Sequence, residues 1–257
     1  MGSLTVAGLR GAVAFLTRVP AASSDDGVDL ASAVPWFPVV GGLVGLFVAS
    51  VYAAGRQLVD PLPSAAVAVA AGVLVTGAFH EDGLADTADA FGAWDATEAR
   101  RILKDPTHGT YGACALVISI LARVAALSSL GGWAALAMVP AAHALARTSA
   151  VLLLRVGPVA TEEGLGAAYA ARVRARHLIG ASVAGVAVGA ISAGLWVGPA
   201  VVLAFVTSCV VGSVGARRVG GLTGDILGAA EQVAEIAVLY LGALIVAQGW
   251  PGLPWWH

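Results

Sequence analysis

Seven long apolar stretches, separated by more polar segments, limit what this sequence can fold into. They cover 38–54, 65–80, 111–130, 134–154, 178–195, 200–215 and 226–248. A helix needs about 20 mostly apolar residues to cross a bilayer. Of the 257 residues, 58% are hydrophobic and 12% are charged, about half the charged share of a soluble domain. We therefore predict one all-α domain over residues 1–257, a polytopic integral membrane bundle of about seven transmembrane helices.

The net charge and the cysteine content argue against several classes of function. A formal charge of −2 gives no basic surface for nucleic acid, so the expected partners are the lipid bilayer and small molecules. Cys114 and Cys209 both lie in apolar stretches, which predicts packed thiols and no disulfide framework or metal cluster. The sequence leaves the oligomeric state open, a homo-oligomer included.

The basic residues predict how the bundle is oriented. With the N-terminus on side one, that side also receives the loops 81–110, 155–177 and 216–225. Eleven of the 14 lysines and arginines fall on side one, whereas Arg56 falls on side two and Arg123 and Arg147 lie inside spans. Cytoplasmic loops carry such an excess of positive charge. Side one is therefore expected to be cytoplasmic, in a multi-pass protein of the inner cell membrane.

The carboxylates follow the same partition, although acidic residues contribute little to topology. Asp60 alone falls on side two, while Glu231 and Glu235 lie in the first turns of the last predicted span. Two interpretations remain open. Either the side-one loops are simply longer, or the cytoplasmic face carries a polar site that needs both signs of charge.

The densest acidic segment is 80–92, directly after an apolar stretch. Asp82, Asp86 and Asp89 are spaced i, i+4, i+7, so on a helix they project from one face. Such like charges repel unless a cation lies among them, and hard oxygen ligands favour Mg²⁺. Glu81 is a further candidate ligand, and His80 is either an interfacial or a catalytic histidine. The alternative is a solvated acidic helix, but basic residues do not interleave with the acids.

The next polar segment, 100–112, suits a phosphate-bearing ligand. Asp105-Pro106 favours a turn, and Gly109 and Gly112 permit close approach of the backbone. A helix is expected to begin near Thr110, so that its first amides could face an anion. Lys104 would add a cation and Asp105 a carboxylate. The alternative is an ordinary connecting loop.

A third polar patch covers 220–231. Asp225 opens an apolar helix and is either its cap or a functional carboxylate. Glu231 lies inside the span, where an ionisable residue is by default a functional hypothesis, and Arg147 is its obvious cationic counterpart. Glu162 and Glu163 begin a further acidic, glycine-containing patch on the same side.

Together these segments resemble the cobalamin synthase family, the adenosylcobinamide-GDP ribazoletransferases. The matching stretches are 15–20, 79–92, 104–112, 162–166 and 221–231, in the order and spacing of the family across nearly the whole chain. The run Gly-Ala-Phe-His-Glu-Asp-Gly-Leu-Ala-Asp-Thr-Ala-Asp, residues 77–89, is the most specific match. One departure is Asp105-Pro106-Thr107, where the family pattern has Asp-Ser-Arg or similar. Lys104, Arg101 or His108 would then supply the phosphate contact.

The resemblance implies a Mg²⁺-dependent enzyme that joins adenosylcobinamide-GDP to α-ribazole, or its 5′-phosphate, and releases GMP. On this hypothesis the metal ligands are Asp82, Asp86, Asp89 and Glu81. The catalytic residues are Asp105, Asp225, Lys104 and His80. Substrate and phosphate contacts come from Arg147, Gly109, Thr110, Gly112, Glu162, Glu163, Thr223, Gly224 and Glu231.

Two alternatives remain at this stage. CDP-alcohol phosphotransferases and intramembrane prenyltransferases also use aspartate-rich helices with Mg²⁺. A transporter would use Glu231, Glu235 and Arg147 as an ion or proton relay, but it predicts charges across the bilayer and related halves. Here the charges gather on one side, and no internal repeat is visible.

Overall fold

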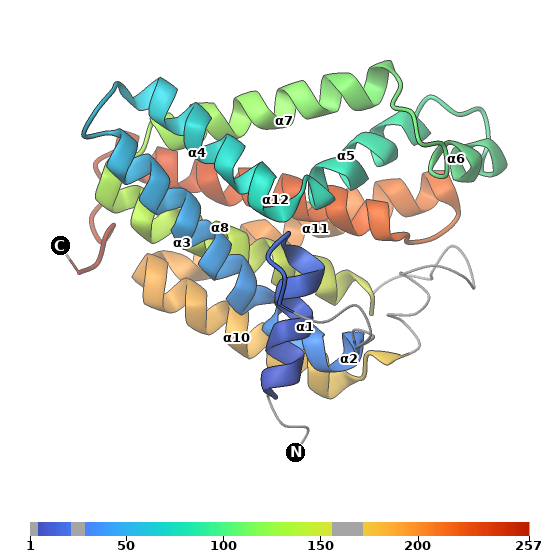
Figure 1. The fold of residues 1–257 in the computed structure, drawn as a ribbon, viewed down its shortest axis with the longest axis horizontal. Helices are drawn as coiled ribbons and strands as arrows, with labels where there is room; N and C mark the ends of the chain where they lie inside the picture. Colours follow the sequence, from blue (N-terminus) through green and yellow to red (C-terminus); the bar gives the residue numbers. More distant parts are fainter. Residues whose placement is uncertain (1–4, 22–28, 156–171, 257) are drawn as a thin grey trace.

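The computed structural model describes residues 5–21, 29–155 and 172–256, and in this part of the chain the regular structure is helical, with no strand. Figure 1 shows the arrangement. In chain order the helices are α1 (Val6–Leu16), α2 (Leu30–Ala33), η1 (Val34–Trp36), α3 (Phe37–Gly55), α4 (Pro61–Thr76), α5 (Phe79–Ala90), α6 (Ala96–Ile102), α7 (Thr110–Ser128), α8 (Gly132–Leu153), α10 (Ala175–Ala193), η2 (Gly194–Trp196), α11 (Val197–Val219) and α12 (Gly224–Ala247).

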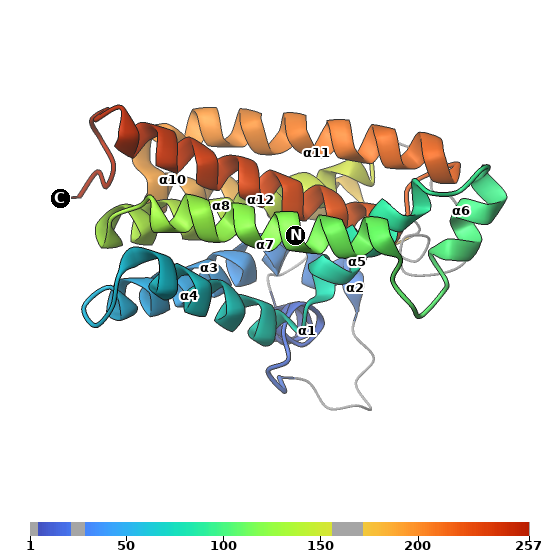
Figure 2. The same cartoon turned by 90° about the horizontal axis from the view of Figure 1, so that it is seen from above.

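Helix α8 is the centre of the bundle. It packs against α3, α10, α11 and α12, and most of its residues are buried. Seen from above, α12 lies between α11 and α7 (Figure 2). The alanines that fill α8 allow its neighbours to approach closely, which is how helices associate in lipid.

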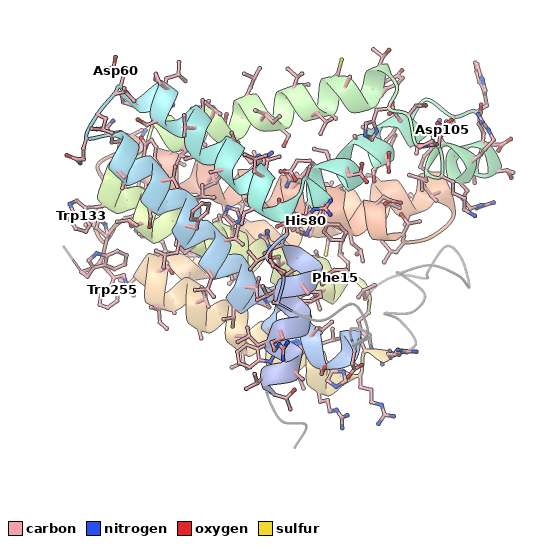
Figure 3. The ribbon with its side chains drawn as sticks, in the orientation of Figure 1. Phe15, Asp60, His80, Asp105, Trp133 and Trp255 are labelled. Atoms are coloured by element: carbon pink, nitrogen blue, oxygen red, sulfur yellow. The ribbon has the colours of Figure 1, made fainter. Side chains whose placement is uncertain are left out.

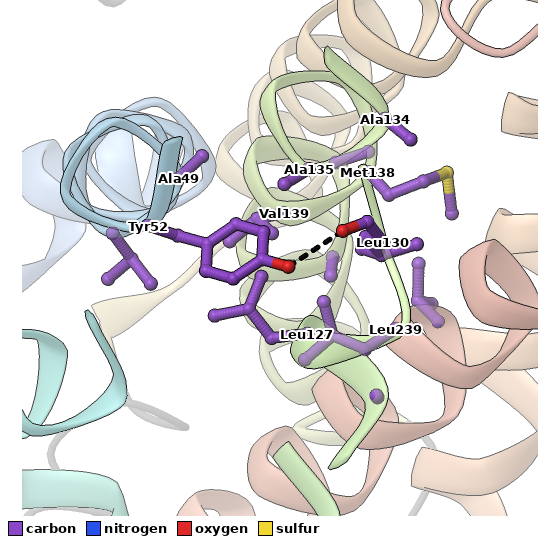
Figure 4. Packing of buried hydrophobic residues seen from close by; sticks show 14 of the residues in the cluster. Ala49, Tyr52, Leu127, Leu130, Ala134, Ala135, Met138, Val139 and Leu239 are labelled. Atoms are coloured by element: carbon purple, nitrogen blue, oxygen red, sulfur yellow. Dashed lines mark hydrogen bonds between the residues drawn. The ribbon is translucent and has the colours of Figure 1, made fainter. Parts of the chain in front are cut away.

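Tyr52 fixes α3 to the turn between α7 and α8. Its ring is fully buried among apolar side chains that include Leu127, Met138 and Val139. Its hydroxyl donates a hydrogen bond of 2.7 Å to the Leu130 carbonyl (Figure 4). A buried tyrosine needs such a partner for its polar end, so this contact fixes how α3 meets the α7–α8 turn.

Each of the seven apolar stretches contains a long helix, but the number of spans is approximate. By length and composition, five helical segments of the described chain could cross a membrane, or up to six if α4 and α5 count as one broken span. One of the five, Ala175–Val219, contains both α10 and α11. These two helices run in opposite directions on either side of η2 (Figures 1 and 2). The fold class is thus the one expected from the sequence.

Asp60, expected on side two, and Asp105, in a loop expected on side one, lie at opposite ends of the bundle (Figure 3). Trp133 and Trp255 lie at the same end as Asp60. The indole N–H of Trp255 donates to the Ile191 carbonyl at the end of α10, and that of Trp196 donates to the Pro251 carbonyl. The C-terminal segment therefore covers the η2 turn.

A sharp break separates α4 from α5. The predicted span 65–80 ends early, at Thr76, and α5 turns away by 91°. Gly77 and Ala78 both adopt left-handed backbone, with φ of 68° and 58°, a conformation that is costly for alanine. The break directs α5 and its carboxylates across the bundle toward the start of α7.

Candidate active site

The three aspartates of α5 lie on one face, which is turned toward the segment before α7. Asp82 and Asp86 approach His108, with the nearest atoms 3.5 and 3.3 Å apart. The carboxylate of Asp89 accepts hydrogen bonds from the Gly109 and Gly112 amides at 2.7 and 2.8 Å. The i, i+4, i+7 spacing therefore places the three side chains on one face of the helix, as predicted.

The side chains in this group are not equivalent. Asp82, Asp86 and His108 each offer one atom, and these atoms lie within 4.8 Å of one another, as a shared cation would require. The Asp82 side chain is 65% exposed and that of Asp86 is 14% exposed. Carboxylate oxygens suit Mg²⁺, whereas imidazole is more typical of transition metals. The two aspartates therefore fit a Mg²⁺ site, with His108 at its edge.

Two of the four predicted metal ligands interact with other groups of the protein. Both oxygens of Asp89 already accept backbone N–H groups, and the side chain is buried. Glu81 points into the bundle, where Arg123 donates to it at 2.8 Å. Successive residues on a helix differ by about 100° in direction, so Glu81 cannot share the face of Asp82.

The predicted phosphate contacts at the start of α7 also need correction. The Gly109 and Gly112 amides were expected to face an anionic ligand, but they donate to Asp89. The protein thus supplies its own anion at this helix end. Thr110 lies between these two glycines and is exposed, so it remains accessible from outside.

Asp225 lies beside the acidic group. The α12 backbone is so close to α5 that a Cβ added at Gly83 would be 2.8 Å from the Asp225 carbonyl oxygen. Asp225 interacts electrostatically with Asp82 and Asp86. The cap of α12 is Thr223, whose hydroxyl accepts from the Ile226 amide at 3.3 Å, and Gly224 begins the helix. The capping role considered for Asp225 therefore falls to Thr223.

Lys104 and Asp105 lie on the exposed turn before His108. Lys104 is exposed. Asp105 accepts from the Thr107 hydroxyl at 2.6 Å and from the Thr107 amide at 3.0 Å. These two hydrogen bonds hold the pKa of Asp105 below its usual range. Asp105 therefore closes its own turn as an ionised group.

Behind the acidic face lies a buried network of ionisable side chains from four helices, α5, α7, α8 and α12. Arg147 on α8 reaches Glu231 on α12 at 2.6 Å, which is the pairing expected from the sequence. His80 at the start of α5 lies 3.5 Å from the other oxygen of Glu231. Arg147 and Glu231 are 3% and 1% exposed. Arg147 is thus buried in an ion pair, away from the exposed aspartates.

The network includes two residues for which no role was predicted from the sequence. Arg123 on α7 pairs with Glu81 at 2.8 Å and lies 3.9 Å from Glu235. His143 on α8 lies 3.1 Å from Glu235. Both residues lie inside apolar stretches, where an ionisable side chain is costly and therefore informative. That signal could have identified them before the structure was known.

Helix α6 is fixed to the bundle by arginines. Arg218 on α11 donates to the Phe91 carbonyl at 2.8 Å, and Arg100 donates to the Val219 carbonyl at 2.6 Å. Asp95 caps α6 by accepting from the Glu98 and Thr97 amides, and these bonds lower the pKa of Asp95. These charges hold the end of α5 in place. The remaining candidates, Glu162 and Glu163, lie outside the described residues.

Across the described residues, an all-helical bundle with membrane-length apolar helices, and with carboxylates gathered on the helix that follows a sharp break, indicates a polytopic membrane enzyme. Sequence comparison identifies the family to which this protein belongs. The chain belongs to the cobalamin-5-phosphate synthase family, whose family model matches residues 8–243. It is accordingly a transferase.

Curated relatives cover nearly the whole chain. The adenosylcobinamide-GDP ribazoletransferase of Azorhizobium caulinodans is 39% identical, over 96% of this chain and 98% of its own length. That of Bradyrhizobium diazoefficiens is 38% identical, over 93% and 94% respectively, and that of Chlorobaculum tepidum is 36% identical, over 93% and 96%. No solved structure matches the chain.

Proposed function

We propose that this protein joins adenosylcobinamide-GDP to α-ribazole, or its 5′-phosphate, in a Mg²⁺-dependent reaction that releases GMP. Relatives of full length carry the name of this activity. The structural observation that supports it best is the group formed by Asp82, Asp86 and His108, whose ligand atoms lie within 4.8 Å. Mg²⁺ is typically held by one or two carboxylates together with substrate phosphates.

The reaction is a displacement at phosphorus. The ribazole hydroxyl oxygen forms a bond to the phosphorus that carries the cobinamide arm, and the bond from this phosphorus to the GMP oxygen breaks. Mg²⁺ held by Asp82 and Asp86 would neutralise charge on the phosphate oxygens. Positioning and electrostatic stabilisation are expected to supply most of the rate enhancement.

The hydroxyl proton needs an acceptor, and Asp225 is the candidate that the geometry favours. Its backbone packs against Gly83, the residue after Asp82, whereas Asp105 accepts hydrogen bonds from Thr107. Lys104, exposed on the neighbouring turn, is positioned to attract the anionic substrate. Thr110 is the remaining candidate contact at the start of α7.

A GMP-release assay with the full-length protein in detergent or nanodiscs tests this function. We expect turnover with both substrates and Mg²⁺, and none after chelation of the metal. The Asp86→Asn variant should lose turnover, whereas Asp60→Asn, an exposed acid at the opposite end of the bundle, should retain it. Release of CMP or pyrophosphate from other substrates, without GMP release, would contradict the proposal.

The site is further proposed to face the cytoplasm. The support is the excess of basic residues on side one and the positive-inside rule. A Thr107→Cys variant, in a background with Cys114→Ser and Cys209→Ser, should react with a membrane-impermeant maleimide in inverted vesicles. Equal labelling in intact spheroplasts would place the site on the other face.

A further inference from the structure

A pocket lies between α1, α3, α5, α8 and α12, and its lining does not include Asp82, Asp86 or Asp225. Its volume is about 70 Å³. On the same measure one water needs roughly 10–15 Å³, so the pocket has room for a small ring system. The wall is mostly apolar, with aromatic rings from three helices and a polar patch at one end.

The aromatic wall is built from rings that are already ordered against one another. Phe15 stacks on Phe37 with centroids 5.4 Å apart and planes within 6°. Phe79 meets Phe15 edge-on at 5.1 Å, and the His80 ring meets Phe79 edge-on at 5.0 Å. Stacked and edge-on contacts are the favoured geometries between flat rings. The wall therefore suits a flat aromatic guest.

The polar end of the pocket argues against a hydrocarbon guest. His80, Arg147 and Glu231 all line it, and all three side chains are nine-tenths or more buried. An acyl chain would gain nothing from these groups and would cover them with hydrocarbon, which is unfavourable for polar atoms. A flat ring with a heteroatom can instead pack on the phenylalanines and direct its polar atom toward this end.

The pocket also adjoins the acidic group. Gly224 and Gly228 of α12 form part of its wall, and Asp225, next to Gly224, belongs to the acidic side. A Cβ added at Gly228 would lie 3.5 Å from the backbone of His80 and Gly83, so α12 and α5 are in close backbone contact between the pocket and the acidic group. A ligand seated in the pocket can therefore present a second group near Asp225.

We propose that this pocket binds the benzimidazole ring of the α-ribazole acceptor, with its sugar directed along the start of α12 toward Asp225. The inference rests on the proposed function, which requires an acceptor with a flat aromatic base and a reactive hydroxyl. It assigns the acceptor ring to this pocket and the diphosphate substrate to the carboxylates of the acidic group.

The test is equilibrium binding of α-ribazole to the full-length protein, followed by the fluorescence of the base. Ala150→Phe places a ring in the pocket, because Ala150 lines it. We expect binding at least about tenfold weaker, a loss of about 1.4 kcal/mol. Leu152→Phe, two residues along α8 and facing a different hollow, is the matched control and should bind normally.

Further measurements distinguish a specific loss of α-ribazole binding from a general loss of folding. Both variants should retain affinity for adenosylcobinamide-GDP, which shows that Ala150→Phe has folded. Phe79→Leu, a milder change at a partly exposed residue, should weaken α-ribazole binding by roughly two- to tenfold through loss of ring contacts.

The outcomes distinguish the two proposals. If the wild type neither binds α-ribazole nor releases GMP, the proposed function fails and the inference fails with it. If the wild type binds and turns over but Ala150→Phe and Phe79→Leu bind α-ribazole normally, the pocket assignment is wrong while the function stands. Copurification of a lipid that Ala150→Phe displaces, without effect on α-ribazole, would likewise overturn the assignment.

Discussion

Arg147 and Glu231 face each other across the interior of the bundle, with their nearest charged atoms 2.6 Å apart. They come from α8 and α12, and Glu231 also lies 3.5 Å from His80 at the start of α5. One ion pair thus connects the central helix to the two helices that carry the acidic site. Its burial makes each partner depend on the other.

Removing one partner should therefore be severe. Arg147→Met leaves the Glu231 carboxylate buried without its closest counter-charge, and we expect a loss of about 3–5 kcal/mol in the free energy of unfolding. Chemical denaturation in detergent micelles measures it. The double variant Arg147→Met with Glu231→Gln should lose less than the sum of the two single changes. Arg101→Met, an exposed change, should stay within about 0.5 kcal/mol; a similar loss there would contradict the argument.

Asp89 should act as an anchor for the loop before α7. Asp89→Ala removes the acceptor of two amide hydrogen bonds, at a cost of about 2–4 kcal/mol. Hydrogen exchange at Gly109 and Gly112 should become faster. Mg²⁺ affinity, in contrast, should change much less than in Asp86→Asn. Equal losses of metal affinity in the two variants would restore Asp89 to the ligand set.

The metal ligands can be tested without turnover. Mn²⁺ binding followed by electron paramagnetic resonance should weaken by about tenfold or more in Asp82→Asn and in Asp86→Asn, since each removes one charged ligand. Both variants should remain folded, because the Asp82 side chain is largely exposed and that of Asp86 is partly exposed. Wild-type affinity in both variants would exclude the site.

Gly112 should tolerate no side chain. A Cβ there would lie 2.9 Å from the Ala85 carbonyl and in contact with Asp89, so Gly112→Ala must push α7 away from α5. We expect a lower melting temperature and a loss of GMP release. Gly198→Ala, where nothing lies within 4 Å of the added carbon, is the control and should behave as wild type. If Gly112→Ala has the melting temperature and GMP release of the wild type, the loop before α7 can move to accommodate the methyl group without loss of stability.

The pH dependence of turnover should not arise from Asp105. Its pKa lies below the usual range because Thr107 donates hydrogen bonds to the ionised form. A lowered pKa stabilises the folded protein at pH values above the unfolded-state pKa of about 3.9, and this stabilisation is lost as the pH falls through the folded-state pKa. Above about pH 5 the group stays ionised. Thr107→Val should therefore leave the acid limb of the rate profile in place, as measured by kcat/KM between pH 5 and 8. A shifted limb would assign it to Asp105.

The acidic site was partly predictable because its information is local. The spacing of Asp82, Asp86 and Asp89 depends only on helix geometry, and the structure turns all three toward one loop. Whether three aspartates on one face also bind the same metal ion depends on which other groups lie opposite each side chain. The backbone amides of Gly109 and Gly112 occupy Asp89, and this could not be seen from spacing alone.

The sequence by itself determined that the chain is an apolar helical bundle with its charges concentrated on one side, because membrane-length apolar runs have few other solutions. It also made Arg147 and Glu231 candidate partners, since unpaired charges are costly in such an interior. Only the tertiary structure decided that α5 breaks away at Gly77, that Glu81 turns inward to Arg123, and that three phenylalanines from separate helices line one pocket. These are contacts between residues far apart in the chain, and they depend on how helices pack, which periodicity does not encode.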